Sequence, residues 1–460
     1  MADPKPETVP GKSQWSSYML QIYKSRTAPQ PLGTVVFEEI EAKAKEKLKD
    51  YGGAFMYAGG SAGTNATYRA NLEAFKKWGI IPRMLVNATS TNLETTIFGV
   101  THSAPLFIAP IGVQAIFAPE AEFNPARAAK ATGVPFILST GASRTIEEIA
   151  EANGDGHRWY QLYWPKNNDV TLSLLKRAKE NNYKALVVTL DTMSLGWRPH
   201  DLEKAYIPFV HGVGVQIGTS DPVFMGRLGR KPVTGVRPAF PYDPTKFDKG
   251  VVEQDPEAVE ATYLGMEWLK EANSGLYRDW EDLKFLRENW EGPLILKGIQ
   301  SVHDAEKALE SGVDGIVVSN HGGRQVDGAI PSLLALEHIM KSSKIKAAQK
   351  DNKFTILFDS GIRTGSDIIK ALALGAQAVL RKSHLYSMSS LSQFRTEYVC
   401  LRCCKVGRPW VYGSVVGGQA GVEQVIRHTL ADLDNTLALA GYRSLSDIQG
   451  KGEDVLMRLT

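Results

Sequence analysis

Residues 319–325, with the sequence SNHGGRQ, contain the residue types best suited to catalysis. His321 could act as a base, and the guanidinium of Arg324 matches a carboxylate with two parallel hydrogen bonds. Asp191 could hold and charge-stabilise that imidazole, which raises its basicity. Arg198, seven residues beyond Asp191, is either a second clamp for the carboxylate or a partner in a surface salt bridge. Together these residues predict proton abstraction from a substrate that carries a carboxylate.

Short apolar runs, most of them separated by amphipathic helical patterns, must position these residues. There are eight, at residues 105–110, 136–140, 159–163, 185–191, 294–298, 315–321, 355–361 and 376–380. Runs that are apolar on both faces and alternate with helices predict a parallel sheet covered by helices. Eight such units favour a closed (β/α)8 barrel, the TIM-barrel fold. An open doubly wound sheet is the alternative, but no G-x-G-x-x-G loop follows the first run.

Polar residues occupy the last positions of these runs. They are Ser139, Gln161, Tyr163, Thr189, Asp191, Lys297, Ser319, His321 and Asp359. In a barrel they converge on the C-terminal face, where barrel active sites are built. A single polar residue at a strand end is more often structural, but nine in one chain predict a functional site.

Glycine-flanked segments after the last two runs contain further arginines. Arg363 follows the seventh run, and Gly407 and Arg408 come after the eighth. Barrels commonly bind a phosphate at this place through loop N–H groups, a helix N-terminus and arginine. A phosphate site beside a base and two arginines predicts a phosphorylated cofactor that handles a carboxylate substrate. These residues alone do not identify that cofactor as a flavin.

Three regions fall outside the barrel pattern. The first is a leading arm with one clear helix at residues 37–51, and the second is a Gly-, Pro- and aromatic-rich stretch far longer than a normal connection. The third contains all three cysteines. We therefore expect an N-terminal arm and helical cap at 1–104, a barrel at 105–450 and a tail at 451–460. Within the barrel we expect a lid loop at 199–276, after the fourth strand, and a suspect insertion at 381–405.

Composition excludes several classes of protein. The 460 residues include 43% hydrophobic residues, which excludes a disordered chain, and a net charge of +3 gives no reason to expect nucleic acid or a membrane surface as partner. No run of about 18 apolar residues is present. The N-terminus is polar and Pro-rich, without the apolar core of a secretion signal. We expect a cytoplasmic location.

The cysteines lie together at positions 400, 403 and 404. This spacing excludes a disulfide framework and is compatible with the reducing cytosol. The three thiols could bind a metal with His384 as a fourth ligand. Zinc ligands normally come as two separated pairs, however, and we predict no metal site.

With these motifs the sequence resembles the FMN-dependent 2-hydroxy acid oxidase and dehydrogenase family, over about residues 35–450. SNHGGRQ, LDT…GWR, LKGIQ, DSGIRTG and GRP occur in the order found in the family. Within the family the chain is most similar to lactate 2-monooxygenase. The supporting features are RANLEAFKKWG at 69–79, APIGV at 109–113, GWRP at 196–199 and the long segment that follows.

The resemblance implies a role for each matching residue. His321 would abstract a proton as hydride moves to the flavin, and Asp191 would pair with the imidazolium. The substrate-binding residues would be Tyr57, Tyr163, Arg198 and Arg324. FMN would be bound by Gly112, Ser139, Gln161, Thr189, Lys297, Ser319, Asp359, Arg363, Gly407 and Arg408. The substrate would be a small, lactate-like L-2-hydroxy carboxylate, with O2 as the second substrate, and the protein would be a homotetramer or homo-octamer.

Gly112 bears on the choice between two activities that the family offers. Its position resembles the one that lies against flavin N5, and glycine would leave room for O2 to react while pyruvate is still held. The expected activity is therefore lactate 2-monooxygenase, which forms acetate, CO2 and water. An oxidase that releases the 2-keto acid and H2O2 is the alternative, and Gly112 could simply permit a tight turn.

The sequence departs from the family pattern at two places. An ungapped match puts Met56 where the family has a carboxylate-binding tyrosine, with Tyr57 one position later. Residues 381–405 interrupt a segment that is continuous in the family, and we interpret them as a retained intron; a tolerated surface excursion is the alternative. If translated, they could weaken FMN binding and leave a catalytically impaired, FMN-free barrel. Another phosphate-binding barrel, such as a nucleotide dehydrogenase or isomerase, is a further alternative.

Overall fold

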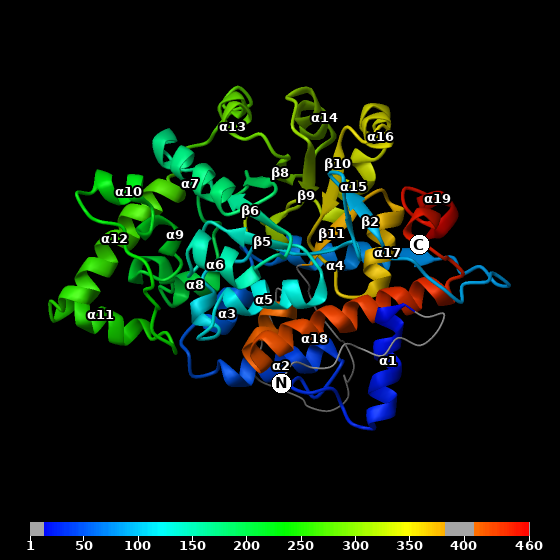
Figure 1. Ribbon diagram of the computed structural model, residues 1–460, viewed down its shortest axis with the longest axis horizontal. Coiled ribbons are helices and arrows are strands. Elements are labelled where there is room, and N and C mark those ends of the chain that lie inside the picture. Colours follow the sequence, from blue (N-terminus) through cyan, green and yellow to red (C-terminus); the bar gives the residue numbers. More distant parts are fainter. Residues whose placement is uncertain (1–12, 382–408, 460) are drawn as a thin grey trace.

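The computed structural model describes residues 13–381 and 409–459. A closed barrel of parallel strands forms its centre (Figure 1), in which each strand pairs with the next along the chain and the last pairs with the first. The strands are β4 Leu106–Ile108, β5 Phe136–Ser139, β6 Arg158–Leu162, β7 Leu186–Thr189, β8 Leu294–Ile299, β9 Gly315–Val318, β10 Thr355–Phe358 and β11 Ala378–Arg381. The predicted TIM barrel is confirmed.

Helices surround the barrel and connect its strands. They are η1 Gln114–Ile116, α5 Phe123–Thr132, α6 Ile146–Asn153, α7 Asn168–Glu180, α13 Leu283–Asn289, α14 Val302–Glu310, η3 His321–Gly323, α15 Ser332–Ile339, α16 Ser343–Lys350, α17 Gly365–Ala373 and α18 Pro409–Leu439. Local sequence fixes several of their starts. Thr145 and Thr364 form capping boxes with the third helical residue of α6 and α17, which satisfies backbone N–H groups that would otherwise lack partners.

The interior of the barrel is a separate apolar cluster, made by alternate residues of the strands. A hairpin formed by β2 Thr95–Ile97 and β3 Val100–His102 contributes Ile97 to this cluster. Phe107 and Trp159 meet within it, with ring centroids 4.7 Å apart. The lower part of the barrel is therefore a packed core, and chemistry is confined to its other end.

The arm before the barrel contains α1 Gln14–Ser25, α2 Phe37–Lys47, α3 Ala54–Gly59, α4 Ala66–Lys76 and β1 Trp78–Ile80. Helix α2 ends four residues earlier than the predicted 37–51. Both α1 and α2 pack against α18 (Figure 1). The chain closes with η4 Leu445–Asp447, α19 Gly452–Val455 and β12 Leu456–Arg458, which pairs antiparallel with β1. The predicted tail is thus joined to the arm.

The predicted lid loop at 199–276 is wrong in one respect, because most of it is helical. It contains α8 Pro199–Glu203, η2 Pro208–His211, α9 Gln216–Thr219, α10 Pro222–Arg227, α11 Pro244–Val252 and α12 Pro256–Ala272, grouped to one side of the barrel (Figure 1). Asp221, Asp243 and Asp255 each cap a helix whose first residue is proline. Proline is preorganised for this first position. Length and a high content of Gly, Pro and aromatic residues therefore indicated a loop, although three of these prolines begin helices.

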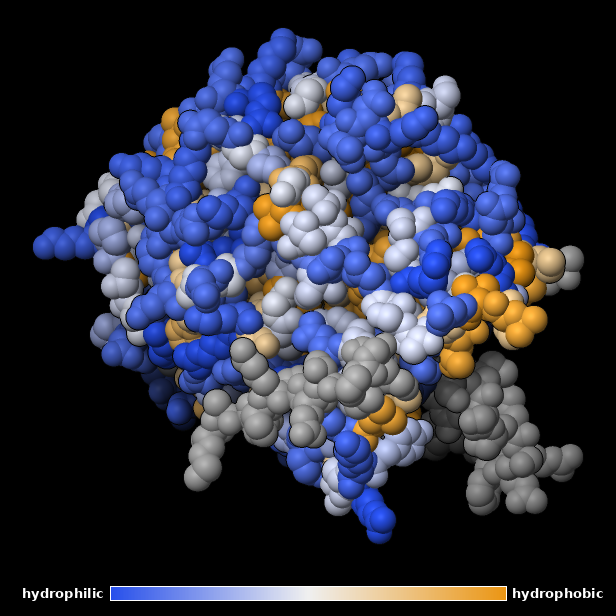
Figure 2. All heavy atoms as spheres, turned by 45° about the vertical axis from the view of Figure 1, so that its right-hand side comes forward, coloured by the Kyte–Doolittle hydropathy of each residue, from blue (hydrophilic) through white to orange (hydrophobic). Residues whose placement is uncertain are grey.

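The described residues were also searched for membrane spans and metal sites. No described helix combines the length and the apolar character needed to cross a bilayer. The face of the molecule drawn in Figure 2 is mostly hydrophilic. No cluster of metal-ligating side chains occurs in ranges 13–381 and 409–459. Cys400, Cys403, Cys404 and His384 lie outside these ranges.

Candidate active site

A layer of polar side chains lies directly above the apolar barrel interior. The apolar layer contains Ile137, Trp159, Val187, Ile295, Val317 and Leu357. Two residues further along the same strands stand Ser139, Gln161, Thr189, Lys297, Ser319 and Asp359, all at most 3% exposed. Because alternate residues of a strand share a face, these side chains also face the barrel axis, now at its C-terminal end.

The polar layer is joined by hydrogen bonds. Ser139 donates to the side-chain oxygen of Gln161 at 3.1 Å, and the Gln161 amide donates to Thr189 at 3.0 Å. On the other side, Lys297 Nζ donates to Ser319 Oγ at 3.0 Å and lies 3.4 Å from Asp359 Oδ2. Burial alone would lower the pKa of Lys297, but the charge of Asp359, aided by that of Asp191, outweighs burial and raises it. Lys297 is therefore a buried cation at physiological pH.

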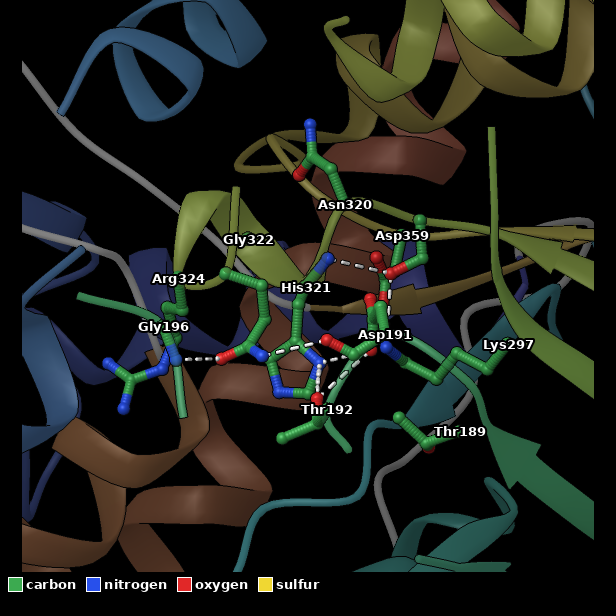
Figure 3. A network of polar contacts seen from close by, with 12 residues as sticks. Thr189, Asp191, Thr192, Gly196, Lys297, Asn320, His321, Gly322, Arg324 and Asp359 are labelled. Atoms are coloured by element: carbon green, nitrogen blue, oxygen red, sulfur yellow. Dashed lines mark hydrogen bonds and ion pairs between the residues drawn. The ribbon is translucent and has the colours of Figure 1, made fainter. Parts of the chain in front are cut away.

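His321 and Asp191 come from different strand ends and meet directly (Figure 3). The Nδ1 atom of His321 lies 2.8 Å from Asp191 Oδ1, and Thr192 Oγ1 lies 3.0 Å from the same nitrogen. His321 opens η3 in the left-handed region, with φ of 57°, an unusual conformation for a residue with a side chain. This backbone is held by Asn320, whose side-chain oxygen accepts the Gly323 N–H at 3.2 Å.

Helix α4 of the N-terminal arm supports the same loop. The side-chain amides of Asn71 and Asn320 exchange two hydrogen bonds, of 2.9 and 2.8 Å. Asn71 also accepts the backbone N–H of Ser332 at 3.0 Å. The arm therefore positions the catalytic loop and does more than cover the barrel.

Two arginines lie beside this pair. Arg198 is 6% exposed and donates from Nε to the Arg324 carbonyl at 3.1 Å. Arg324 is also 6% exposed and donates to the carbonyl of Gly60 at 2.7 Å. This burial favours the clamp over the surface salt bridge considered for Arg198, although Asp201 is 3.9 Å away.

Tyr57 stands on α3, against the Arg324 guanidinium. Its ring centre is 5.8 Å from the guanidinium carbon. Burial raises the pKa of Tyr57 to about 12, so its hydroxyl stays a donor at neutral pH. Tyr57 lines the cavity beside His321, and Met56 does not. Of the two neighbouring residues considered from the sequence, the side chain at the cavity is therefore that of Tyr57.

Gln325 connects the two loops that carry these residues. Its amide nitrogen donates to the carbonyls of Asp191 and Ser194, at 2.7 and 2.8 Å. Its amide oxygen accepts from Arg198 Nη2 at 2.7 Å and from the Gly196 N–H at 3.2 Å. Gln325 therefore fixes Asp191 and Arg198 relative to each other.

One cavity, open to solvent, brings part of the predicted set together. Its lining includes Tyr57, Gly112, Ser139, Tyr163, Arg198, His321 and Arg324. The lid adds Phe209, Trp268, Leu269, Ala272 and Asn273. Gln161, Thr189, Lys297, Ser319 and Asp359 do not line this cavity and belong to the buried polar layer.

Gly112 has a packing reason to be glycine. A Cβ on Gly112 would collide with the carbonyl oxygen of Gly141, which also accepts the Val113 N–H at 2.8 Å. The loops after β4 and β5 thus touch through their backbones. Because this contact by itself requires glycine, Gly112 alone does not distinguish a monooxygenase from an oxidase.

Of the expected phosphate-binding residues, the structure describes Arg363. Arg363 is next to the start of α17, and its Nε is 3.7 Å from Asp367. It does not line the cavity that contains His321. Gly407 and Arg408 lie outside the described residues.

Several residues of the site were missed from the sequence. Thr192 and Gln325 stand inside the motifs already singled out, so their position in those motifs was a usable signal. Phe209 and Trp268 carried no such signal, because they lie in the segment expected to be a loop. Their helices had to fold over the barrel before they could be assigned to the site.

Comparisons with known proteins agree with this geometry. A family profile described as FMN-dependent dehydrogenase matches residues 44–390 and 401–454. An FMN-dependent alpha-hydroxy acid dehydrogenase of Schizosaccharomyces pombe is 42% identical over 434 residues, 93% of each chain. An L-lactate oxidase of Lysinibacillus sphaericus is 33% identical and covers 93% of this chain and 94% of its own. A crystal structure of mandelate oxidase superposes with a TM-score of 0.66 at 30% identity, covering 90% of this chain and 96% of the other.

Proposed function

The chain belongs to the FMN-dependent dehydrogenase family, and from this premise we propose that it oxidises an L-2-hydroxy acid and passes the electrons to O2. The oxidation of a 2-hydroxy acid with FMN follows from the family. The observation that supports this chain's competence for it is that His321, paired with Asp191, lines one cavity together with two buried arginines.

The residues present fit a flavin. The polar layer offers a buried ammonium group together with hydroxyl and amide groups, as the nitrogen- and oxygen-rich edge of the ring requires. In the described part of the chain, Asp359 Oδ2 is fully buried and has the Lys297 ammonium 3.4 Å away, but it accepts no hydrogen bond of good geometry. Buried acceptors are usually satisfied, so a hydroxyl of the ribityl chain is a suitable donor to it. Ser139, Gln161, Thr189, Lys297, Ser319 and Asp359 would hold the ring and the ribityl chain.

The protein's own groups divide the reaction between them. Arg198 and Arg324 bind the substrate carboxylate, and Tyr57 and Tyr163 donate hydrogen bonds to substrate oxygens. Because Asp191 faces Nδ1, His321 takes the proton of the 2-hydroxyl group at Nε2. FMN, when bound, would supply the acceptor for the hydride of C2.

Two charges in the site favour this step. Asp191 stabilises the imidazolium that His321 becomes when it takes the proton. Lys297 keeps a positive charge in the buried polar layer, which favours electron uptake by the cofactor. Both charges are in place before the substrate binds, so no reorganisation is needed during the reaction.

A second activity, lactate 2-monooxygenase, is favoured by the lid. Phe209 and Trp268 line the lid side of the cavity, and slow escape of the 2-keto acid past them would keep it bound until O2 has reacted. Product analysis separates the two activities. Aerobic turnover of L-lactate that gives the keto acid and an equal amount of H2O2 supports the oxidase, and acetate with CO2 supports the monooxygenase.

The test of the main proposal is anaerobic loss of the visible flavin absorbance on adding L-2-hydroxy acids to FMN-loaded protein. We expect L-2-hydroxy acids to reduce the flavin of the wild-type protein and to leave that of His321→Asn oxidised. His303→Asn is the matched control, since the His303 side chain is 85% exposed. A protein that stays colourless after FMN addition would favour the FMN-free barrel, and a flavin that no 2-hydroxy acid bleaches would favour another FMN-binding barrel.

We also propose that residues 381–405 derive from a retained intron. The family profile supports an insertion in the middle of this stretch, because it leaves residues 391–400 unmatched. The test is to sequence the transcript across codons 380–406. A message without these codons supports the proposal, and a spliced message that encodes them contradicts it.

The remaining expectations are a cytoplasmic location and assembly into a homotetramer or homo-octamer, which we retain as proposals. Fractionation of the source cells tests the first. Analytical ultracentrifugation of the FMN-loaded protein tests the second, and a monomer would contradict it.

A further inference from the structure

The cavity has two chemically different walls. The groups that the proposed function assigns to the carboxylate and the 2-hydroxyl are Tyr57, Tyr163, Arg198, His321 and Arg324. The wall formed by the lid and by the loop after β7 is apolar and consists of Leu195, Phe209, Trp268, Leu269 and Ala272. We call these five residues the apolar wall.

The lid lining contains no charged residue. Asn273 is its only polar member, and the Asn273 amide is engaged as a donor to the Thr192 carbonyl at 2.9 Å. The wall therefore offers no ion-pair partner to a charged substituent. Burying such a substituent without a partner would be strongly unfavourable.

Trp268 is held firmly in this wall. It is 2% exposed, and Phe224 packs edge-on against it with ring centroids 5.0 Å apart. A Cβ on Gly218 would collide with the Trp268 indole, so α9 packs its backbone directly onto the ring. The indole is fixed from behind by the lid itself.

Phe209 is fixed in the same way. A Cβ on Gly265 of α12 would collide with the Phe209 carbonyl oxygen. The Phe209 ring lies only 2.9 and 3.3 Å from the positions that a Cβ would take on Gly214 and Gly141. Both aromatic residues are thus placed before any ligand binds, and a preformed apolar pocket costs little ordering when it is filled.

We propose that the substrate carries a bulky apolar group on C2, a branched aliphatic or an aromatic one, in place of the methyl group of lactate. This inference rests on the proposed function, which places the carboxylate and the hydroxyl at the polar wall. A methyl group is too small to fill a pocket bounded by a tryptophan, a phenylalanine and two leucines. Each methylene that fills such a pocket raises kcat/KM by about 10-fold or more.

The test compares three acids as reductants of the FMN-loaded, full-length protein under anaerobic conditions. L-3-phenyllactate carries the large apolar group, L-lactate the methyl group and L-malate a charged group. We expect the second-order rate constant of flavin reduction to be at least about 10-fold higher for phenyllactate than for lactate, and lowest for malate.

A variant assigns the preference to the apolar wall. Ala272→Leu places a larger side chain in the apolar wall and so makes the cavity smaller. Leucine is also a good helix former, so the variant should fold. In this variant we expect the ratio of the rate constants of flavin reduction by phenyllactate and by lactate to fall by about 10-fold. Met266→Ala is the control on the same helix, because Met266 is 42% exposed and does not line the cavity.

Each result has a distinct meaning. Reduction by lactate as fast as by phenyllactate overturns this inference and leaves the proposed function intact. An unchanged ratio in Ala272→Leu overturns the assignment of the substituent to the apolar wall. Absence of reduction by all three acids overturns the proposed function, and this inference with it.

Discussion

Histidines stand near both ends of the barrel, in opposite electrostatic settings. At the C-terminal end, His321 lies 2.8 Å from the carboxylate of Asp191. Near the hairpin at the other end, the rings of His102 and His157 pack 4.8 Å apart, and His157 Nε2 accepts the indole N–H of Trp159 at 2.8 Å. The pKa of both is lowered to about 4, by burial and, for His157, also by neighbouring cationic groups.

The difference indicates what a buried imidazole needs in order to act as the base that we propose. Burial always penalises the charged form, and an adjacent carboxylate offsets that penalty. His321 has such a carboxylate and faces a cavity, so its proton can be taken up and released. Among the described residues, neither His102 nor His157 forms an ion pair with a carboxylate, and both pack as neutral groups against aromatic rings. The following predictions test this contrast, from the largest expected effect to the smallest.

Replacing His321 should have the largest effect. His321→Asn removes the base, and we expect flavin reduction by L-2-hydroxy acids to slow by about 10³-fold. Stopped-flow absorbance measures the rate. His157→Asn, at the other end of the barrel, is the comparison and should reduce flavin at nearly the wild-type rate. Equal losses in the two variants would contradict the contrast.

Neutralising Asp191 should have the next largest effect. Asp191→Asn keeps the shape of the side chain but no longer stabilises the imidazolium, and we expect kcat/KM to fall by about 100-fold. The same stopped-flow assay, run over a range of substrate concentrations, measures the loss. A rate within twofold of the wild type would show that the carboxylate is not what distinguishes His321.

Gln325 should act through position, with a smaller effect. Gln325→Ala removes the hydrogen bonds to Arg198 and to the Asp191 carbonyl, so both groups should shift. We expect kcat/KM to fall by about 10-fold, with KM raised more than kcat is lowered. Val326→Ala is the neighbouring control, since Val326 is 61% exposed. A loss confined to kcat would contradict a role in holding the carboxylate clamp.

The histidines near the hairpin should affect only stability in acid. With folded pKa values of about 4 against an ordinary value of 6.5, the unfolded chain binds more protons between these two pH values. Their contribution is therefore fully present above pH 6.5 and is lost as the pH falls toward 4. Thermal unfolding followed from pH 7 to pH 4.5 should show a smaller loss of Tm in His102→Phe than in the wild type. His303→Asn, at an exposed position, should leave the slope unchanged.

The strands were more predictable than their ends. The predicted runs 315–321 and 355–361 include polar residues, but β9 ends at Val318 and β10 at Phe358. The chain leaves the sheet where the polar side chains begin, because His321 must turn through a left-handed conformation to reach Asp191. The pattern of residues along a strand is local and can be recognised from the sequence. The residue at which the strand ends depends on partners more than 100 residues away in the chain.

The lid shows the opposite case. Its Asp-Pro pairs at 221–222, 243–244 and 255–256 are local helix-start signals that the sequence contained. A high content of Gly and Pro obscured them. Which of its side chains would face the cavity was not readable, because that depends on how Gly218 and Gly265 let Trp268 and Phe209 pack.

By itself, the sequence determined the eight-stranded barrel, the polar residues at its strand ends and the motif that carries His321 and Arg324. These follow from periodicity and residue type, which act within a few residues. Only the tertiary structure decided that Tyr57 and not Met56 lines the cavity, that Gly112 is required by the Gly141 backbone, and that the lid adds an apolar wall. These features depend on close contacts between segments far apart in the chain, and such contacts exist only after the barrel, the arm and the lid have packed together.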